Sequence, residues 1–384
     1  MEAAGQIRWH GMLAATASVT AVGIGIGLSV PLLSTILETR GYSATLIGLN
    51  SATAGLASIA ITPFVTPLAV RFGVVPVLLT SIMLAAVSLC LFYFVPSVWW
   101  WFPLRIVYHS MLNIIFILSE FWISSSAPPK RRGLVLGVYA TVLSAGFAAG
   151  PWLFSVLGSA GIAPFAAGAA IILAAALPTA YAARHSPTME GETSSGGVIR
   201  FSLLVPTATA AVLIFGAVET GSFALFPVYG ARIGFNEAEA ALLISMIGVG
   251  NVVMQLPLGL LSDRVRDRRV LLVSLSFVGL AGILLLPLTG LNWWLAALLM
   301  FAWGGAVGGL YIVGLSHLSA RLSGRDLASA NAAFVLCYSI GMLVGPQIIG
   351  IGMDAAGPNG FAWTLALFFF AYVSFASVRI VRST

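Results

Sequence analysis

Long apolar stretches separated by short polar segments make up almost the whole chain. Twelve of these stretches are long enough to cross about 30 Å of hydrocarbon as a helix. They are predicted at residues 10–37, 44–70, 75–95, 98–124, 134–158, 161–183, 203–229, 238–261, 270–290, 293–318, 327–351 and 360–381. The pattern therefore predicts an all-α integral membrane protein with twelve transmembrane helices.

One polar interruption is much longer than the others. Residues 184–201 read RHSPTMEGETSSGGVIRF, a serine- and glycine-rich run that is typical of a flexible linker. It separates residues 1–183 from residues 202–384, and each part holds six predicted spans. We therefore expect two six-helix bundles joined by a cytoplasmic linker.

Composition excludes a soluble protein. The 384 residues have a mean hydropathy of +1.03 and are 8% charged, whereas soluble domains carry about 25% charge. Cys90 and Cys337 lie inside apolar runs with no CxxC spacing, so neither a disulfide framework nor a metal site is predicted. No phosphate-binding loop is present, so ATP is not expected to act directly and no cofactor is predicted.

The basic residues lie at the ends of the apolar stretches, so membrane orientation explains the pI of about 9.7 better than a nucleic-acid partner does. With the N-terminus inside and the first span retained, fifteen of the 18 basic residues are cytoplasmic: Arg8, Arg71, Lys130, Arg131, Arg132, Arg184, Arg200, Arg264, Arg266, Arg268, Arg269, Arg321, Arg325, Arg379 and Arg382. Only Arg40 and Arg232 fall in outer loops, and Arg105 lies within a span. We expect both termini to be cytoplasmic and the protein to lie in the inner membrane.

The fourth span carries a polar stripe on an otherwise apolar helix. Arg105, His109, Asn113 and Glu120 fall within an arc of roughly 80° at about 100° per residue. Buried charges in a membrane cost a few kcal/mol each and usually mark a functional path. The stripe predicts a wet cavity on one side of this helix, although His109 is as readily a hydrogen-bonding core residue.

Glu219 lies near the middle of the seventh span. A carboxylate there is poorly solvated as an anion, so it is a candidate proton carrier; a structural hydrogen bond to a neighbouring helix is the alternative. Aromatic residues in the fourth, seventh and tenth spans either stack on a flat substrate or simply pack: Phe116, Phe215, Phe223 and Tyr311.

The two halves repeat one another, as in many transporters. Gly41-Tyr42-Ser43 precedes the second span and Gly234-Phe235-Asn236 precedes the eighth, an offset of 193 residues. Gly146-x-x-x-Gly150-Pro151 and Gly341-x-x-x-Gly345-Pro346 are offset by 195 residues. A duplicated six-helix unit accounts for both matches.

After the eighth span the chain reads Gly259-Leu-Leu-Ser-Asp263-Arg264-Val-Arg-Asp-Arg-Arg. This segment resembles the Gly-x-Leu-x-Asp-Arg-x-Gly-x-Arg-Arg motif of the major facilitator superfamily, with Arg266 in place of the second glycine. The resemblance implies that the Asp–Arg element ties helices together and that spans 1, 4, 7 and 10 line a central cavity. Glu219 and the polar stripe would then share one surface. The segment Gly146 to Pro151 resembles a motif of the family's drug–proton antiporters, although small residues at this spacing also serve helix packing.

These observations predict a monomeric secondary transporter that moves a small amphipathic or planar organic molecule by alternating access, most simply as proton-coupled efflux. Proton-coupled uptake of a vitamin or organic acid is the alternative, with Arg105 as the anion contact. A membrane enzyme would need a metal or phosphate constellation that the sequence lacks. A non-transporting receptor on the same fold would be expected to lose its titratable cavity groups, which Glu219 argues against.

Overall fold

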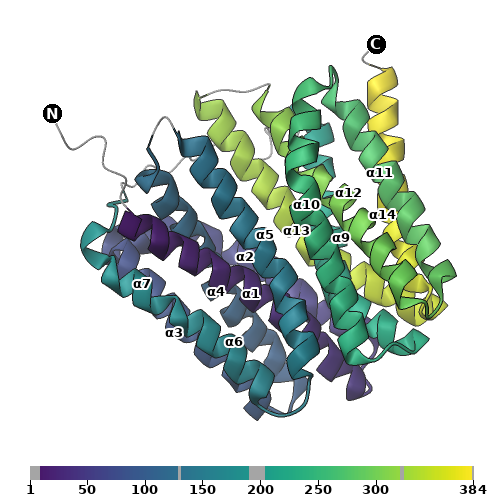
Figure 1. Cartoon of the computed structure of the whole chain (residues 1–384), viewed down its shortest axis with the longest axis horizontal. Coiled ribbons are helices and arrows are strands. Elements are labelled where there is room, and N and C mark those ends of the chain that lie inside the picture. The colour runs from purple at the N-terminus through teal and green to yellow at the C-terminus, as the bar shows by residue number, and fades with distance from the viewer. Residues whose placement is uncertain (1–8, 129–130, 190–203, 321–323, 383–384) are drawn as a thin grey trace. The chain divides into compact units, whose positions relative to one another are not determined.

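The computed structural model describes residues 9–128, 131–189, 204–320 and 324–382 (Figure 1). Within these ranges, twelve helical segments are long and apolar enough to cross a membrane. The prediction of an all-α protein with twelve spans is confirmed. Most of the predicted linker, residues 190–201, lies outside the described residues, as do Arg8, Lys130, Arg200 and Arg321 of the orientation argument.

The first six spans are α1 (Trp9–Thr39), α2 (Ala44–Phe72), α3 (Val74–Phe94), α4 (Val98–Ser126), α5 (Arg132–Leu157) and the pair α6 (Ala163–Ala174) and α7 (Ala176–Tyr181). The short 3₁₀ turn η2 (Ala183–His185) follows. The other six are α9 (Pro206–Ile233), α10 (Glu237–Arg264), α11 (Arg268–Leu285) with η3 (Leu286–Thr289), α12 (Trp293–Ser319), α13 (Gly324–Ala356) and α14 (Gly360–Val381). The largest boundary difference is at α13, which runs five residues beyond the predicted end and stops before Gly357, whose φ is 66°.

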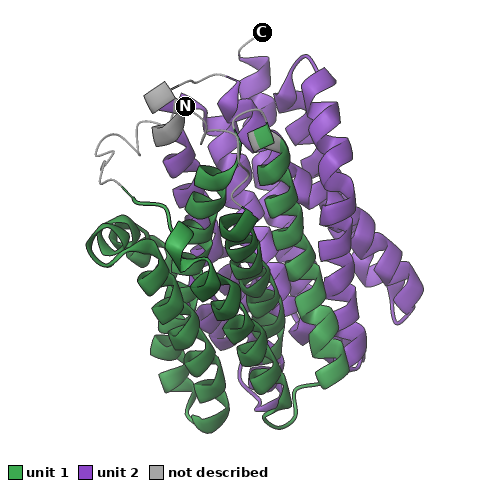
Figure 2. Cartoon of the chain, turned by 60° about the vertical axis from the view of Figure 1, so that its left-hand side comes forward, with its two compact units in different colours: residues 1–32, 57–193 green, residues 33–56, 194–384 purple. Residues whose placement is uncertain are grey.

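The chain forms two compact units (Figure 2). Unit 1 contains residues 1–32 and 57–193, and unit 2 contains residues 33–56 and 194–384. The end of α1 and the first half of α2 therefore pack with the C-terminal half of the chain. The division into bundles 1–183 and 202–384 stays a prediction from the sequence.

The repeated glycine triplets end one helix in the same way in both halves. Gly41 has a φ of 80° and Gly234 a φ of 109°, which glycine adopts without strain. The amide of Tyr42 donates to the carbonyl five residues earlier at 3.1 Å, and that of Phe235 does the same at 2.9 Å. Both hydrogen bonds are those of a glycine-terminated helix end.

The third residue of each triplet starts the next helix. Ser43 Oγ accepts a hydrogen bond from the amide of Leu46 at 3.2 Å. Asn236 Oδ1 accepts one from the amide of Glu239 at 2.9 Å, and the Glu239 carboxylate accepts from the Asn236 amide in return. In both halves, the repeated triplet therefore ends one helix and starts the next.

In unit 1 the glycines of α5 allow close packing against α1. A side-chain carbon at Gly146 would lie 3.0 Å from Cα of Gly23, and one at Gly150 would collide with the backbone of Gly27. Pro151 lies at the same crossing, against Gly27. Such contact between backbones is how small residues at this spacing hold membrane helices together.

Unit 2 contains the same crossing between α9 and α13. A side chain at Gly341 would collide with the backbone of Leu213, and one at Gly345 with the backbone of Ala217. Gly216 of α9 lies equally close to the backbone of Tyr338 on α13. Because the crossing occurs in both units, the geometry accounts for the glycine–proline repeat as helix packing.

We predict that Gly345→Ala lowers the stability of the protein by about 1–3 kcal/mol, because the new methyl group forces α9 and α13 apart. Gly259→Ala is the matched control, since an added carbon there meets nothing within 4 Å and alanine favours a helix. Thermal unfolding of both purified variants in detergent checks this. Equal unfolding midpoints would contradict the packing role.

Candidate functional site

Glu219 lies in the middle of α9, and one tyrosine holds it. The hydroxyl of Tyr338 on α13 donates a hydrogen bond of 2.7 Å to Glu219 Oε2. Glu219 is only partly buried. Among the described residues, no arginine, lysine or histidine forms an ion pair with it. The carboxylate therefore has one neutral donor and no cation from the described part of the protein.

Four aromatic rings from three helices gather beside this carboxylate. Phe215, one turn before Glu219, lies 5.5 Å from the ring of Tyr311 on α12 and 5.9 Å from that of Tyr338. Tyr311 lies 5.4 Å from the ring of Phe334 on α13 and 6.4 Å from Tyr338. The two tyrosines are partly exposed, whereas Phe215 and Phe334 are buried. We call Phe215, Tyr311, Phe334 and Tyr338 the aromatic cluster.

The sequence predicted Glu219, Phe215 and Tyr311 but missed Phe334 and Tyr338. The signal was present, because these two aromatics are four residues apart and so share one face of α13. Phe223, also predicted, lies one turn beyond Glu219 on α9 and is buried.

The polar residues of α4 share a helix face but not one environment. Arg105 has no exposed surface, and His109 is 5% exposed. His109 Nδ1 lies 3.1 Å from the carbonyl oxygen of Arg105. Between them, Tyr108 Oη donates to the carbonyl of Gly25 on α1 at 3.0 Å. Arg105 and His109 therefore lie inside the packing of unit 1.

Further along α4 the residues of the stripe become more exposed. Asn113 Nδ2 donates a hydrogen bond to Thr62 Oγ1 on α2 at 3.1 Å, so this side-chain amide is used in the contact between α4 and α2. Phe116 is half-buried, and Glu120 is exposed on the protein surface. Neighbouring helices thus cover part of the stripe, which periodicity alone does not reveal. The α4 residues belong to unit 1 and Glu219 to unit 2, so a surface shared by both stays a prediction.

The motif-bearing loop between α10 and α11 is held by short ionic contacts. Asp263 Oδ1 lies 3.4 Å from Arg268 Nη2, and the Asp263 side chain is 73% exposed. Arg268 Nε also donates to Ser262 Oγ at 3.1 Å. Gly259 has open space around it, and Arg264 is exposed. The aspartate of the motif thus joins the end of α10 to the start of α11.

Asp267 starts α11. Its carboxylate accepts a hydrogen bond from the Arg269 amide at 2.9 Å and pairs with the Arg269 guanidinium at 2.8 Å. The hydrogen bonds from Arg269 hold the pKa of Asp267 below its ordinary value. Asp267 is therefore ionised at neutral pH and its charge is matched within the loop.

A second charged group occurs within unit 2, where α1 ends and α2 begins. Asp354 of α13 accepts hydrogen bonds from the amides of Ala44 and Thr45, at 3.0 and 2.8 Å, and so caps α2. Arg232 of α9 binds Glu38 of α1 through two nitrogens, at 2.8 and 3.2 Å. Its third nitrogen lies 3.6 Å from Asp354.

We call Glu38, Arg232 and Asp354 the acid–arginine cluster. Beside it, Gly48 and Gly55 of α2 lie directly against the backbone of α13, at Pro346 and Leu343. The sequence did not predict this cluster, because its three charged residues are about 120 to 320 residues apart along the chain.

Comparison with known proteins identifies the family of this chain. The sequence model of the Major Facilitator Superfamily matches residues 15–249 and 208–382. The chain belongs to the major facilitator superfamily. The resemblance that the loop after α10 suggested is therefore confirmed, and the chain is a multi-pass membrane transporter of this superfamily.

Relatives in the superfamily match over most of the chain. An uncharacterized MFS-type transporter, YfkF of Bacillus subtilis, is 28% identical over 335 residues, which cover 85% of both chains. The MFS-type transporter YcaD of Escherichia fergusonii is 26% identical over 266 residues, which cover 68% of this chain and 67% of that protein.

Solved structures share the superfamily fold. A bacterial homolog of the human lysosomal transporter Spinster, in an inward-facing and unoccupied conformation, matches with a TM-score of 0.77 and 16% identity over 97% of this chain and 95% of that one. A mutant of the nucleoside transporter NupG matches with a TM-score of 0.77 and 15% identity over 98% of this chain and 99% of that one.

We predict that Asp354→Ala loosens the start of α2. The substitution removes the hydrogen bonds from the Ala44 amide, the Thr45 amide and the Thr45 hydroxyl, as well as the ion pair with Arg232. A lost helix cap costs about 1–2 kcal/mol, which raises local opening about 5- to 30-fold. The probe is a cysteine at the buried Ser51, in a variant without Cys90 and Cys337, labelled with a membrane-impermeant maleimide. Asp326→Asn, at the exposed far end of α13, is the control. Equal labelling rates in both variants would refute the role of Asp354 in holding the start of α2.

Proposed function

We propose that this superfamily member is a proton antiporter that expels small planar organic cations. The carboxylate of Glu219 carries the proposal. It lies partly accessible in the middle of a membrane helix, with Tyr338 as its hydrogen-bond partner and no ion pair within the described chain.

An ionised carboxylate at this depth needs compensation for the water it has lost. A proton or a cationic ligand supplies it, and one carboxylate accommodates only one of them at a time. Competition between proton and substrate at a single group couples their movements in opposite directions. With a proton gradient directed into the cell, the cation leaves.

The aromatic cluster supports a flat, positively charged substrate. Cations bind the faces of aromatic rings within about 6 Å of the ring centre, and the attraction strengthens where water is excluded. Tyr311 and Tyr338 are the partly exposed members, so their rings are the surfaces that a bound molecule would reach first. The buried Phe215 and Phe334 hold them in place.

The alternative hypothesis, uptake of an organic acid, requires Arg105 to contact the anionic substrate. Arg105 has no exposed surface in this structure, whereas Glu219 is partly accessible. This contrast favours a cation over an anion as substrate.

The proposal places the protein in the inner membrane as a monomer, with both termini in the cytoplasm, on the distribution of arginine and lysine. In that orientation the acid–arginine cluster lies at the outer ends of its helices.

Purified protein in liposomes that contain a pH-sensitive dye tests the proposal. A panel of planar aromatic cations and their uncharged isosteres is added in turn. We expect the added cations, and not the uncharged isosteres, to enter the liposomes while protons leave, so that the enclosed dye reports a rise in internal pH. Glu219→Gln should abolish this proton flux. Asp326→Asn is the control for a lost carboxylate elsewhere in unit 2 and should retain the flux. Proton movement in the same direction as the compound, or flux that survives in Glu219→Gln, would contradict the proposal.

Tyr338→Phe separates the hydrogen bond from the ring. We expect the variant to transport the same cations several-fold more slowly, because the ring of the aromatic cluster remains while the donor to Glu219 is lost. Initial rates in the same liposomes measure this. Rates equal to those of the wild type would show that the hydroxyl has no part in transport.

A further inference from the structure

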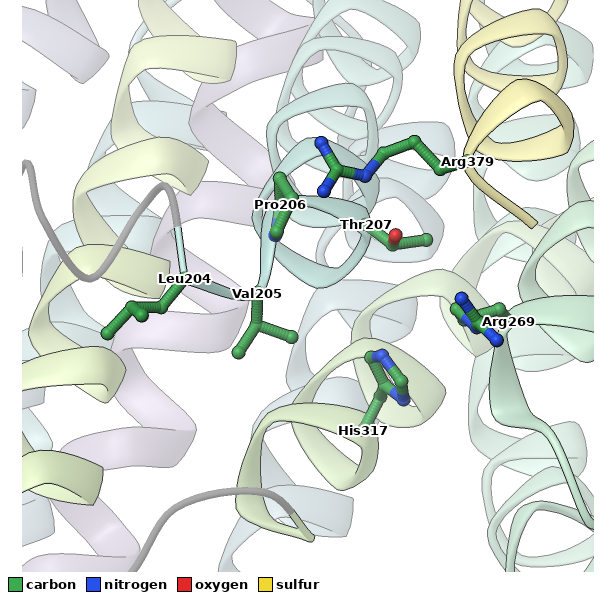
Figure 3. Close-up of a pocket in the computed structure, with 7 residues that line it drawn as sticks. All are labelled: Leu204, Val205, Pro206, Thr207, Arg269, His317 and Arg379. Carbon is green, nitrogen blue, oxygen red and sulfur yellow. The ribbon is translucent and has the colours of Figure 1, made fainter. Parts of the chain in front are cut away.

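A polar cavity lies in unit 2, at the end where α9 begins. Its volume is about 320 Å³. One wall is the start of α9, and three basic side chains reach it from three other helices: Arg269 of α11, His317 of α12 and Arg379 of α14 (Figure 3). We call this cavity the basic pocket and propose that it binds a phosphate group carrying a single negative charge.

Charge balance in the basic pocket selects the class of ligand. Asp267 and Arg269 form an ion pair of 2.8 Å, and Asp267 is ionised at neutral pH, so these two charges cancel. Arg379 then supplies one fixed positive charge, and the buried His317 adds a polar ring nitrogen. One net charge matches a phosphodiester better than a doubly charged free phosphate, because a second negative charge would stay unmatched.

The start of α9 adds a favourable field. Pro206 occupies the first turn, and no side chain caps this helix end. The positive end of the helix dipole therefore faces the basic pocket, as at many phosphate sites. Tyr372 Oη donates to the carbonyl of Thr207 at 3.1 Å, which ties α14 to this wall and holds Arg379 beside it.

The surroundings favour the phosphate of a lipid headgroup. Leu204 lines the pocket and is 46% exposed, and Phe375 and Val378 beside Arg379 on α14 are 41% and 49% exposed. The guanidinium of Arg379 lies 5.8 Å from the centre of the Phe375 ring. Apolar surface next to a basic pocket at the ends of membrane helices suits an anionic phospholipid, whose chains cover the apolar residues while its phosphate meets the arginine.

Thermal unfolding of the full-length protein in detergent tests the site with three probes: phosphatidylglycerol, phosphatidylcholine and inorganic phosphate. We expect phosphatidylglycerol to raise the unfolding midpoint saturably. Phosphatidylcholine should have little effect, because its choline cation cancels the charge of its phosphodiester and leaves the positive charge of the basic pocket unmatched. Arg379→Gln should need about tenfold more phosphatidylglycerol for half the effect, the loss of roughly one charge-assisted contact. Arg382→Gln is the matched control, since it removes the same charge from the same helix end but does not line the pocket, and it should respond as the wild type does.

The same experiment separates the two sources of phosphate. Stabilisation by inorganic phosphate that depends on Arg379, without any effect of the lipid, would overturn the lipid as ligand and the charge argument for a phosphodiester. An equal phosphatidylglycerol response in both variants, or no response to either phosphate-bearing anion, would overturn the proposal. If Arg379→Gln does not fold, native mass spectrometry of the wild type replaces it, by comparing how much phosphatidylglycerol and phosphatidylcholine the protein retains. Equal retention of the two lipids would then overturn the proposal.

Discussion

A carboxylate in the middle of a membrane helix, bonded to one tyrosine and paired with no cation in the described chain, is the constraint around which this transporter is best understood. Ionised and alone, Glu219 would be costly in a medium with little water. It therefore needs either a proton or a positively charged guest. That single requirement connects the protein's placement of Tyr338, the nearby aromatic cluster and the proposed exchange of substrate for proton.

Glycine makes the hydrogen bond to Glu219 possible. Gly216 lies one turn before Glu219 on α9 and touches the backbone of Tyr338, while Gly341 and Gly345 bring α13 down onto α9. Without these contacts the two helix axes would stand farther apart, and the tyrosine hydroxyl would not reach the carboxylate at 2.7 Å. In unit 1 the same kind of crossing joins α1 and α5, and the helix segments described there, residues 18–31 and 141–155, contain no Asp or Glu. The duplicated packing thus joins helices closely in both units, and in unit 2 it also brings Tyr338 to the carboxylate of Glu219.

Hydropathy alone predicted all twelve spans, because crossing a lipid bilayer demands long apolar helices whatever else the protein does. The two glycine triplets were also recognisable as a repeat from the sequence, because Gly41 and Gly234 end their helices through hydrogen bonds between residues close along the chain. Contacts between residues far apart in the chain could not be predicted from the sequence. Tyr338 is 119 residues from Glu219, and Asp354 is 309 residues from Thr45, so no local pattern joins either pair. The α4 stripe shows the same limit: periodicity placed Arg105 and Glu120 on one face, while the neighbours that bury one and leave the other exposed come from elsewhere in the chain.

Proton release on substrate binding tests the central claim most directly. Purified protein in detergent and weakly buffered solution is titrated with a planar aromatic cation such as ethidium, near neutral pH, while a pH indicator counts the protons that leave. If proton and cation compete for Glu219, wild-type protein releases up to one proton for each cation bound, and Glu219→Gln releases none. Binding of the cation without proton release in the wild type, or equal release in the variant, would contradict the account.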